Sequence, residues 1–244
     1  MVRIGILGAG RIGQVHARAV GETKGATLVA ISDPFPEAAQ AIADEHGCDI
    51  RSVDEIDAAP DIDGVLICSP TDLHADQIEQ FARAGKAVFC EKPIDLDIAR
   101  VTACLSVVEE TGAVLMLGFN RRYDADFKAL KAVIDAGRIG EVEMITITSR
   151  DPGPPPLEYI ARTGGIFRDM TIHDFDVARW MLGEEVETVV AQASVLTDAA
   201  IGEAIDYIDN QDPNTLLVTA ADSDGGGLEV FQFKPYDRPE GNFD

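Results

Sequence analysis

The chain has 244 residues, 46% of them hydrophobic, and it is long enough to bury a core without disulfide or metal staples. Its formal net charge of −23 argues against general nucleic-acid binding and against docking on an anionic membrane, since both need a positive surface. The longest apolar runs have the length of strands, so no membrane-spanning helix is expected.

The excess of acidic residues has two interpretations. Asp and Glu number 43 against 20 Lys and Arg, and the acids are spread along the chain. One interpretation is an acidic proteome adapted to a high-salt cytoplasm, where salt screens the self-repulsion, and the small share of lysine favours it. The other is an unusually acidic protein of ordinary conditions.

Cysteine usage indicates a reducing compartment. The four cysteines form no C-x-x-C pair, and Cys68 and Cys90 lie in apolar runs where a thiol is usually a small buried hydrophobe. The apolar N-terminus runs straight into a glycine turn, which is typical of a first strand and not of a signal peptide. The expected location is the cytoplasm.

The first part of the chain alternates apolar runs with helix-like segments. Runs that are apolar throughout are typical of strands covered on both faces, and they occur at residues 3–7, 27–32, 64–67, 87–90 and 114–117. Helices are expected between them, over residues 12–20, 37–45, 72–84 and 97–109. Repeated β-α units predict an α/β fold, a doubly wound parallel sheet of the Rossmann type.

The pattern changes after residue 118. Helices are predicted over residues 123–136 and 171–182, each ended by a glycine. Strands are predicted over residues 142–149, 187–196, 215–219 and 228–233. These elements predict a second, α+β domain with a mostly antiparallel sheet, so that the chain divides into residues 1–119 and 120–244.

A glycine-rich motif follows the first predicted strand. In G-x-G-x-x-G, Gly8 permits the tight turn, Gly10 lets a pyrophosphate approach the backbone, and Gly13 lets the helix pack on the strand. Asp33 ends the second predicted strand, where a carboxylate accepts hydrogen bonds from ribose hydroxyls and repels a 2′-phosphate. NAD is therefore the predicted cofactor. The predicted cofactor-binding residues of these segments are Gly8, Gly10, Arg11, Ile12, Gly13 and Asp33.

Two further segments carry candidate catalytic groups. Lys92 follows a predicted strand directly, which directs it toward the crevice where open α/β sheets bind ligands. Asp169 and His173 are four residues apart and share a helix face if the helix begins near Asp169. A histidine suits the base that an alcohol oxidation needs near neutral pH. Thr171 and Asp174 also resemble a capping box.

The motifs together resemble the Gfo/Idh/MocA family of NAD(P)-dependent sugar and polyol dehydrogenases, and most closely its members that oxidise inositol. The resemblance covers residues 2–219. The matching segments are residues 8–13, 68–74, 91–93, 118–123 and 169–173, with residues 149–152, 158–160 and 164–165 supporting the inositol branch.

The resemblance implies a role for each matched position. Lys92 would bridge the substrate hydroxyl and the nicotinamide ribose, and His173 would be the general base, tuned and oriented by Asp169. For Arg122 and Asp151, a surface salt bridge is an equally open interpretation. The remaining implied cofactor contacts are Ser69, Thr71, His74 and Glu91, and the implied substrate contacts are Arg121, Arg122, Asp151, Asp169 and His173.

The resemblance fades near Ala220, and family members continue into a larger antiparallel sheet. A shifted reading frame, a natural short variant and a fragment of a longer chain are all compatible with this. Three functions stay open: NAD-dependent oxidation of a cyclic polyol such as myo-inositol, the same chemistry on another sugar, and a non-catalytic NAD-binding protein with an incomplete second domain. No metal, nucleic acid or membrane is expected, and the family implies a homo-oligomer, which a shortened sheet would weaken.

Overall fold

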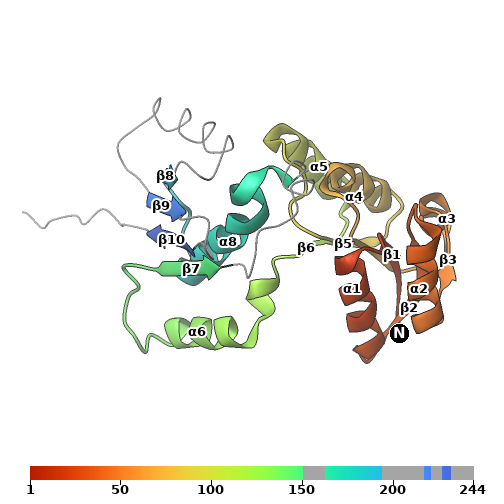
Figure 1. Cartoon of the computed structure of the whole chain (residues 1–244), viewed down its shortest axis with the longest axis horizontal. Coiled ribbons are helices and arrows are strands. Elements are labelled where there is room, and N and C mark those ends of the chain that lie inside the picture. Colours follow the sequence, from red (N-terminus) through yellow and green to blue (C-terminus); the bar gives the residue numbers. More distant parts are fainter. Residues whose placement is uncertain (151–162, 194–216, 221–226, 232–244) are drawn as a thin grey trace, which may run out of the picture. The chain divides into compact units, whose positions relative to one another are not determined.

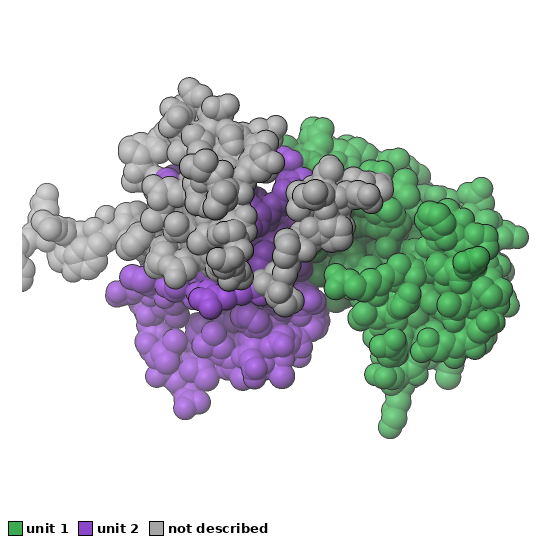
Figure 2. Space-filling model, viewed as in Figure 1, with its two compact units in different colours: residues 1–118 green, residues 119–244 purple. Residues whose placement is uncertain are grey.

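A computed structural model of the chain describes residues 1–150, 163–193, 217–220 and 227–231. The chain forms two compact units, residues 1–118 and 119–244, which are coloured separately in Figure 2. The first unit is an α/β domain and the second is an α+β domain (Figure 1). Among the helices of the described ranges, none is both long and apolar enough to cross a bilayer.

The first unit is built on a six-stranded sheet in the order β3-β2-β1-β4-β5-β6. Every pair of neighbouring strands in it is parallel, so the chain must cross over the sheet between strands. This order is that of a doubly wound dinucleotide-binding sheet, and it confirms the predicted fold class. The strands are β1 (Val2–Leu7), β2 (Ala26–Ser32), β3 (Asp49–Ile50), β4 (Gly64–Ile67), β5 (Ala87–Cys90) and β6 (Leu115–Leu117).

Local sequence signals set the ends of the crossover helices. In α2, Pro36 occupies the first turn and Gly47 ends the helix with a φ of 68°, a left-handed conformation that glycine adopts without strain. In α5, the Asp97 side chain accepts a hydrogen bond from the Ala99 amide and caps the helix. The helices are α1 (Arg11–Glu22), α2 (Pro36–His46), α3 (Val53–Ala58), α4 (His74–Arg83) and α5 (Ile98–Thr111), with a 3₁₀ turn η1 (Thr71–Leu73) before α4.

The core of the first unit consists of two apolar clusters. Alternate residues of a strand point to opposite faces of the sheet. Ile6 and Ile31 accordingly belong to the cluster that includes α1 and α2, whereas Leu7 and Ala30 belong to the cluster that includes α3, α4 and α5. All four side chains are at most 1% exposed, and burying one isoleucine or leucine contributes about 1.5–3 kcal/mol. Both faces of the sheet are therefore covered.

The cysteines are part of this apolar interior. All four are free thiols. Burial raises the pKa of the Cys68 and Cys90 thiols above the ordinary value, so both stay protonated. The interpretation of Cys68 and Cys90 as small buried hydrophobes is confirmed. In the described part of the chain, no cluster of His, Cys, Asp or Glu is arranged to hold a metal ion.

The second unit places helices beside a four-stranded sheet in the order β7-β10-β9-β8. Strand β10 pairs antiparallel with both its neighbours, while β8 and β9 are parallel, so the sheet is mostly antiparallel as predicted. The elements are η2 (Asn120–Tyr123), α6 (Ala125–Asp135), β7 (Thr146–Arg150), η3 (Phe167–Thr171), α8 (Ile172–Leu182), β8 (Val190–Ala193), β9 (Leu217–Ala220) and β10 (Gly227–Phe231).

Two elements of this unit begin later than the sequence predicts. Helix α6 starts at Ala125, because the Asp124 side chain accepts hydrogen bonds from the Asp126 and Phe127 amides and caps it there. Strand β7 starts at Thr146, which pairs with Phe231 at the end of β10. The apolar residues before Thr146 therefore lie outside the described sheet.

Candidate functional site

The predicted cofactor-binding residues of the first unit all lie in segments that follow the carboxyl ends of strands. Residues 8–13 follow β1, Asp33 follows β2, residues 69–74 follow β4, and Glu91 with Lys92 follows β5. Strands β1 and β4 are neighbours at the centre of the sheet, where the strand order reverses. Open α/β sheets bind ligands at this switch point.

The three positions of the glycine motif differ in whether the fold has room for a side chain. Gly8 has a φ of +98°, and a Cβ atom there would lie 2.6 Å from the Cys68 carbonyl oxygen. A Cβ on Gly13 would lie 2.0 Å from the Gly8 carbonyl oxygen, whereas a Cβ on Gly10 would meet nothing within 4 Å. Gly8 and Gly13 are therefore required by the fold itself, and Gly10 leaves open space in front of the backbone.

The amino end of α1 is suited to a phosphate. Gly10 is the N-cap residue and offers no side-chain cap, and the first turn has no acidic residue. Amides at a helix start that no side chain satisfies attract an anion. Arg11 and Ile12 form the exposed start of this helix. The loop thus fits the pyrophosphate of a dinucleotide.

The Asp33 carboxylate is fixed beside the glycine loop. One oxygen accepts a hydrogen bond from the Ala9 amide at 2.6 Å, and the other accepts one from the Phe35 amide at 2.8 Å. The Gly8 amide donates to the Ser32 carbonyl at 2.8 Å, which ties the end of β2 to the same loop. A negative charge held at this point favours a ribose diol over a 2′-phosphate.

The open space at Gly10 leads to a paired prediction. Gly13→Ala is expected to unfold the first unit or to lower its thermal midpoint by several degrees or more, because the methyl group meets backbone 2.0 Å away. Gly10→Ala is expected to leave the midpoint unchanged and to weaken NADH binding at least about tenfold, because the methyl group fills the ligand's space. Circular dichroism and NADH fluorescence titration measure the two effects. A Gly10→Ala protein with normal NADH affinity would contradict the assignment of the loop.

The His74 side chain, which the resemblance places along the cofactor, lies in the interior of the first unit. Its ring is 2% exposed. Its Nδ1 lies 2.7 Å from the Pro93 carbonyl oxygen and its Nε2 lies 2.8 Å from the Ser69 carbonyl oxygen. Both ring nitrogens are thus used within the protein. The Ser69 hydroxyl donates to Gln77 at 2.6 Å, and the half-buried Thr71 opens η1.

The segment after β5 is anchored at Glu91. His16 Nε2 lies 2.6 Å from Glu91 Oε1. The other carboxylate oxygen faces Gly118, where a Cβ atom would come within 2.8 Å of it. Lys92 is half-buried, and the peptide bond between Lys92 and Pro93 is cis. The structure gives Glu91 a partner within the protein, which the sequence-based assignment to the cofactor did not include.

Asp169 and His173 lie on one continuous helical segment of the second unit. The predicted α-helix beginning near Asp169 is replaced there by two consecutive elements. Asp169 is in the π-helical turn η3, and α8 begins only at Ile172. Gly164 and Gly165, with φ of 75° and 81°, lead into this segment. The wider π turn changes the four-residue spacing, and such turns often occur at functional sites. The His173 ring packs edge-on against Phe119, with centroids 6.2 Å apart.

The expected capping box between Thr171 and Asp174 is not formed. Thr171 is itself helical, with φ −66° and ψ −20°, and makes no side-chain cap. Asp174 is fully buried and forms an ion pair with Arg121. The Ser149 hydroxyl donates to Asp174 at 2.6 Å, and Arg121 donates to Ser149 at 3.1 Å. The Asp174 carboxylate thus pairs with Arg121 and Ser149, and Thr171 is itself buried, with 0% of its surface exposed.

The predicted substrate contacts Arg121 and Arg122 both pair with carboxylates of α8. Arg122 donates two hydrogen bonds to Asp176, at 2.8 and 2.6 Å, and this carboxylate raises the pKa of the guanidinium. Arg122 thus forms a salt bridge, with a partner whose side chain is 6% exposed. Asp151 lies outside the described residues. The structure thus uses both arginines to join η2 to α8.

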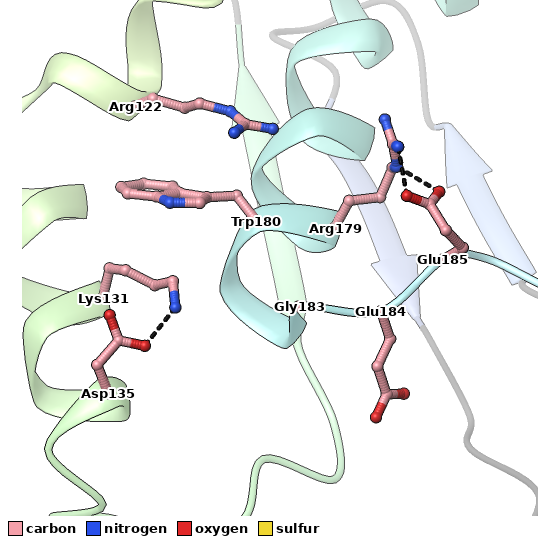
Figure 3. Close-up of a pocket in the computed structure, with 8 residues that line it drawn as sticks. All are labelled: Arg122, Lys131, Asp135, Arg179, Trp180, Gly183, Glu184 and Glu185. Atoms are coloured by element: carbon pink, nitrogen blue, oxygen red, sulfur yellow. Dashed lines mark hydrogen bonds and ion pairs between the residues drawn. The ribbon is translucent and has the colours of Figure 1, made fainter.

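A hollow of about 480 Å³ lies beside α6 and α8 (Figure 3). Arg122 lies over the Trp180 ring at 5.9 Å from its centroid, a cation–π distance. Lys131 pairs with Asp135, and Arg179 pairs with Glu185 (Figure 3). The cations lining the hollow are thus already neutralised, and neither Asp169 nor His173 lines it.

The strand order, the glycine loop and the fixed acid after β2 define a dinucleotide-binding α/β domain that is followed by an α+β domain. Residues 2–119 match the family model described as "Oxidoreductase family, NAD-binding Rossmann fold", and residues 127–240 match the "GFO/IDH/MocA C-terminal domain". The chain belongs to the Gfo/Idh/MocA family of oxidoreductases.

Several proteins similar to this chain are named inositol dehydrogenases. The chain is 66% identical over 206 residues to an inositol 2-dehydrogenase of Rhizobium meliloti (strain 1021), an alignment that covers 84% of this chain and 62% of the relative. A solved myo-inositol dehydrogenase of Corynebacterium glutamicum is 36% identical, with a TM-score of 0.78 over 99% of this chain and 78% of that one. A scyllo-inositol dehydrogenase of Lactobacillus casei, solved with NAD(H) and scyllo-inositol, is 33% identical, with a TM-score of 0.68 over 76% and 57%. The chain thus spans about 62% of the length of the Rhizobium relative.

Sequence reasoning missed the contact of His16 with Glu91 and the pairing of Asp174 and Asp176 with the two arginines. His16 follows Gly13 by three residues, so it lies on the face of α1 that also carries this packed glycine, and that spacing was a usable signal. The carboxylate partners of Arg121 and Arg122 had no such signal, because a single sequence does not identify which of 43 acids pair with them.

Proposed function

We propose that the chain oxidises a cyclic polyol of the inositol class to a ketone with NAD. The observation that carries this proposal is the 66% identity to an inositol 2-dehydrogenase over 84% of this chain. The Asp33 carboxylate, held by two amides beside the glycine loop, supports NAD over NADP. The relative solved with scyllo-inositol supports the substrate class.

Three residues carry the proposed chemistry. NAD, when bound, supplies the acceptor for the substrate's ring hydrogen. Lys92 would donate a hydrogen bond to the substrate hydroxyl and hold it in line with the cofactor ribose. His173 would take the hydroxyl proton as general base, with Asp169 orienting its ring. The proposal requires the two units to present these groups to one substrate molecule.

Fewer residues are proposed to bind the substrate than the resemblance implied. Arg121 and Arg122 are paired with Asp174 and Asp176, so we propose that they order the second unit and do not bind the hydroxyls. Asp151 remains a predicted substrate contact. A homo-oligomer formed through the second-domain sheet, and a cytoplasmic location, also remain predictions.

The testing experiment is NADH formation by the purified 244-residue chain, followed by absorbance. The panel is myo-inositol, scyllo-inositol, glucose and xylose, each with NAD or NADP, at low and at molar KCl. Inositol-dependent signal with NAD is the expected result. A signal only with glucose or xylose would overturn the inositol assignment and indicate a dehydrogenase of the same family that acts on another sugar. Silence with every sugar, together with intact NADH binding, would overturn the proposal in favour of a non-catalytic NAD-binding protein.

The cofactor preference leads to a prediction at Asp33. Asp33→Ser removes the charge and is expected to lower kcat/KM for NAD about 10- to 100-fold and to raise it for NADP, because the 2′-phosphate is no longer repelled. Asp33 also accepts two backbone hydrogen bonds, so thermal unfolding must be measured in parallel. An unchanged NAD to NADP ratio in a stably folded variant would contradict the role of Asp33.

A further inference from the structure

The residues on each side of Lys92 are both bound by a histidine. His16 contacts the Glu91 side chain, and His74 contacts the Pro93 carbonyl. The two histidines belong to different helices, α1 and α4. The resemblance implies a cofactor contact for His74 and no role for His16. The segment that carries the proposed catalytic lysine is therefore fixed at both ends by imidazole rings.

On the amino side, Glu91 has little freedom. Its Oε1 lies 2.6 Å from His16 Nε2, and the two side chains are only 17% and 19% exposed. The His16 ring packs edge-on against Phe89 of β5, with centroids 5.0 Å apart, which holds the ring in place. The Glu91 amide donates to the Ile67 carbonyl at 3.0 Å. Both the backbone and the side chain of Glu91 are thus tied to neighbouring elements.

On the carboxyl side, His74 bridges two strand-end segments. Its nitrogens face the carbonyl oxygens of Pro93, after β5, and Ser69, after β4. A carbonyl oxygen only accepts hydrogen bonds, so a neutral ring donates to one of the two carbonyls, through the nitrogen that carries the proton, and packs its other nitrogen against the second. With the ring 2% exposed, water does not substitute for it easily. His74 therefore sets the spacing between the two segments.

We propose that His16 and His74 are positioning residues for Lys92, a role that rests on the proposed function. Lysine has a long flexible side chain, so the place of its amine depends on a fixed backbone at its base. A catalytic group displaced by about 1 Å can lose about 100-fold in rate. Two independent anchors, one on each side, keep that backbone at the carboxyl end of β5.

The test compares four variants of the full chain. His16→Leu and His74→Leu remove the anchors, and His16→Gln keeps an amide donor for Glu91. His46→Leu is the matched control, since His46 also lies in the first unit, has a side chain 13% exposed, and forms its ion pair with Glu45. We expect kcat to fall about 10- to 100-fold in both anchor variants, with KM for NAD within about threefold. His16→Gln is expected to regain most of the loss, and His46→Leu to keep wild-type kcat.

A second readout does not depend on turnover. The acylation rate of Lys92 by an amine reagent, followed by peptide mass spectrometry, reports how its amine is presented. We expect this rate to change in His16→Leu and His74→Leu and to stay constant in His46→Leu and His16→Gln. Circular dichroism shows whether each variant is folded. If His74→Leu does not fold, the two His16 variants alone test the positioning role.

Wild-type kcat and an unchanged Lys92 acylation rate in folded His16→Leu would overturn the positioning role. An equal loss of kcat in His46→Leu would also overturn it, because the effect would then be general destabilisation. If the wild-type chain oxidises no polyol, the proposed function fails, and the acylation rates still decide whether the histidines hold Lys92.

Discussion

Lys92→Ala is expected to lower kcat by about two to four orders of magnitude while NADH affinity stays within about threefold. The proposed amine acts on the substrate hydroxyl, whereas the glycine loop and Asp33 hold the other end of the cofactor site. Removing the amine therefore costs transition-state stabilisation more than cofactor binding. Steady-state kinetics with the best polyol of the panel and NADH fluorescence titration measure the two quantities.

Lys24→Ala supplies the control for this experiment, because Lys24 is an exposed lysine of the same unit. Its kcat is expected to equal that of the wild type. A Lys92→Ala protein that retains more than about a tenth of wild-type kcat would contradict a catalytic role for the lysine. Equal loss of NADH binding and turnover would instead assign Lys92 to the cofactor alone.

Arg121→Leu is expected to destabilise the second unit by about 3–5 kcal/mol. Asp174 is fully buried, and the substitution leaves its carboxylate without the guanidinium partner. A buried charge that loses its partner costs far more than an exposed one. Trp180 is the single tryptophan of the chain and lies in α8, so its fluorescence during urea unfolding reports this unit.

Two controls test whether the destabilisation comes from the buried, unpaired charge of Asp174. Arg179→Leu breaks the pair with Glu185, whose side chains are 46% and 76% exposed, and is expected to cost less than about 1 kcal/mol. The double variant Arg121→Leu/Asp174→Leu removes both charges and is expected to be more stable than Arg121→Leu alone. Equal destabilisation by Arg121→Leu and Arg179→Leu would show that burial of Asp174 contributes nothing.

The α/β fold was predictable because its signals are local. Strands such as residues 64–67 are apolar throughout, and the sequence predicts their bounds correctly since both faces of the sheet are covered. The third β-α unit was not predictable, because β3 has two residues and α3 has six, too few to show a period. The α3 capping box, Ser52 with Glu55, was the available signal for that unit.

In the candidate site, too, residues of a local motif were predictable, and contacts between distant residues were not. Gly8, Gly13 and Asp33 follow from a motif whose spacing is fixed by backbone geometry, so the sequence predicts their surroundings well. The partners of Arg121 lie 28 and 53 residues away, and only the fold brings Ser149 and Asp174 to it. The π turn at Asp169 was equally hidden, since its sequence is compatible with an ordinary helix.

The contact between Glu91 and Gly118 constrains how this sequence can evolve. Any side chain at position 118 would begin 2.8 Å from Glu91 Oε2, and the carboxylate is not free to swing aside while His16 holds its other oxygen. A lineage that replaced Gly118 would have to shorten residue 91 or release it from residue 16. Positions 16, 91 and 118 are therefore expected to change together or not at all, although they are far apart in the chain.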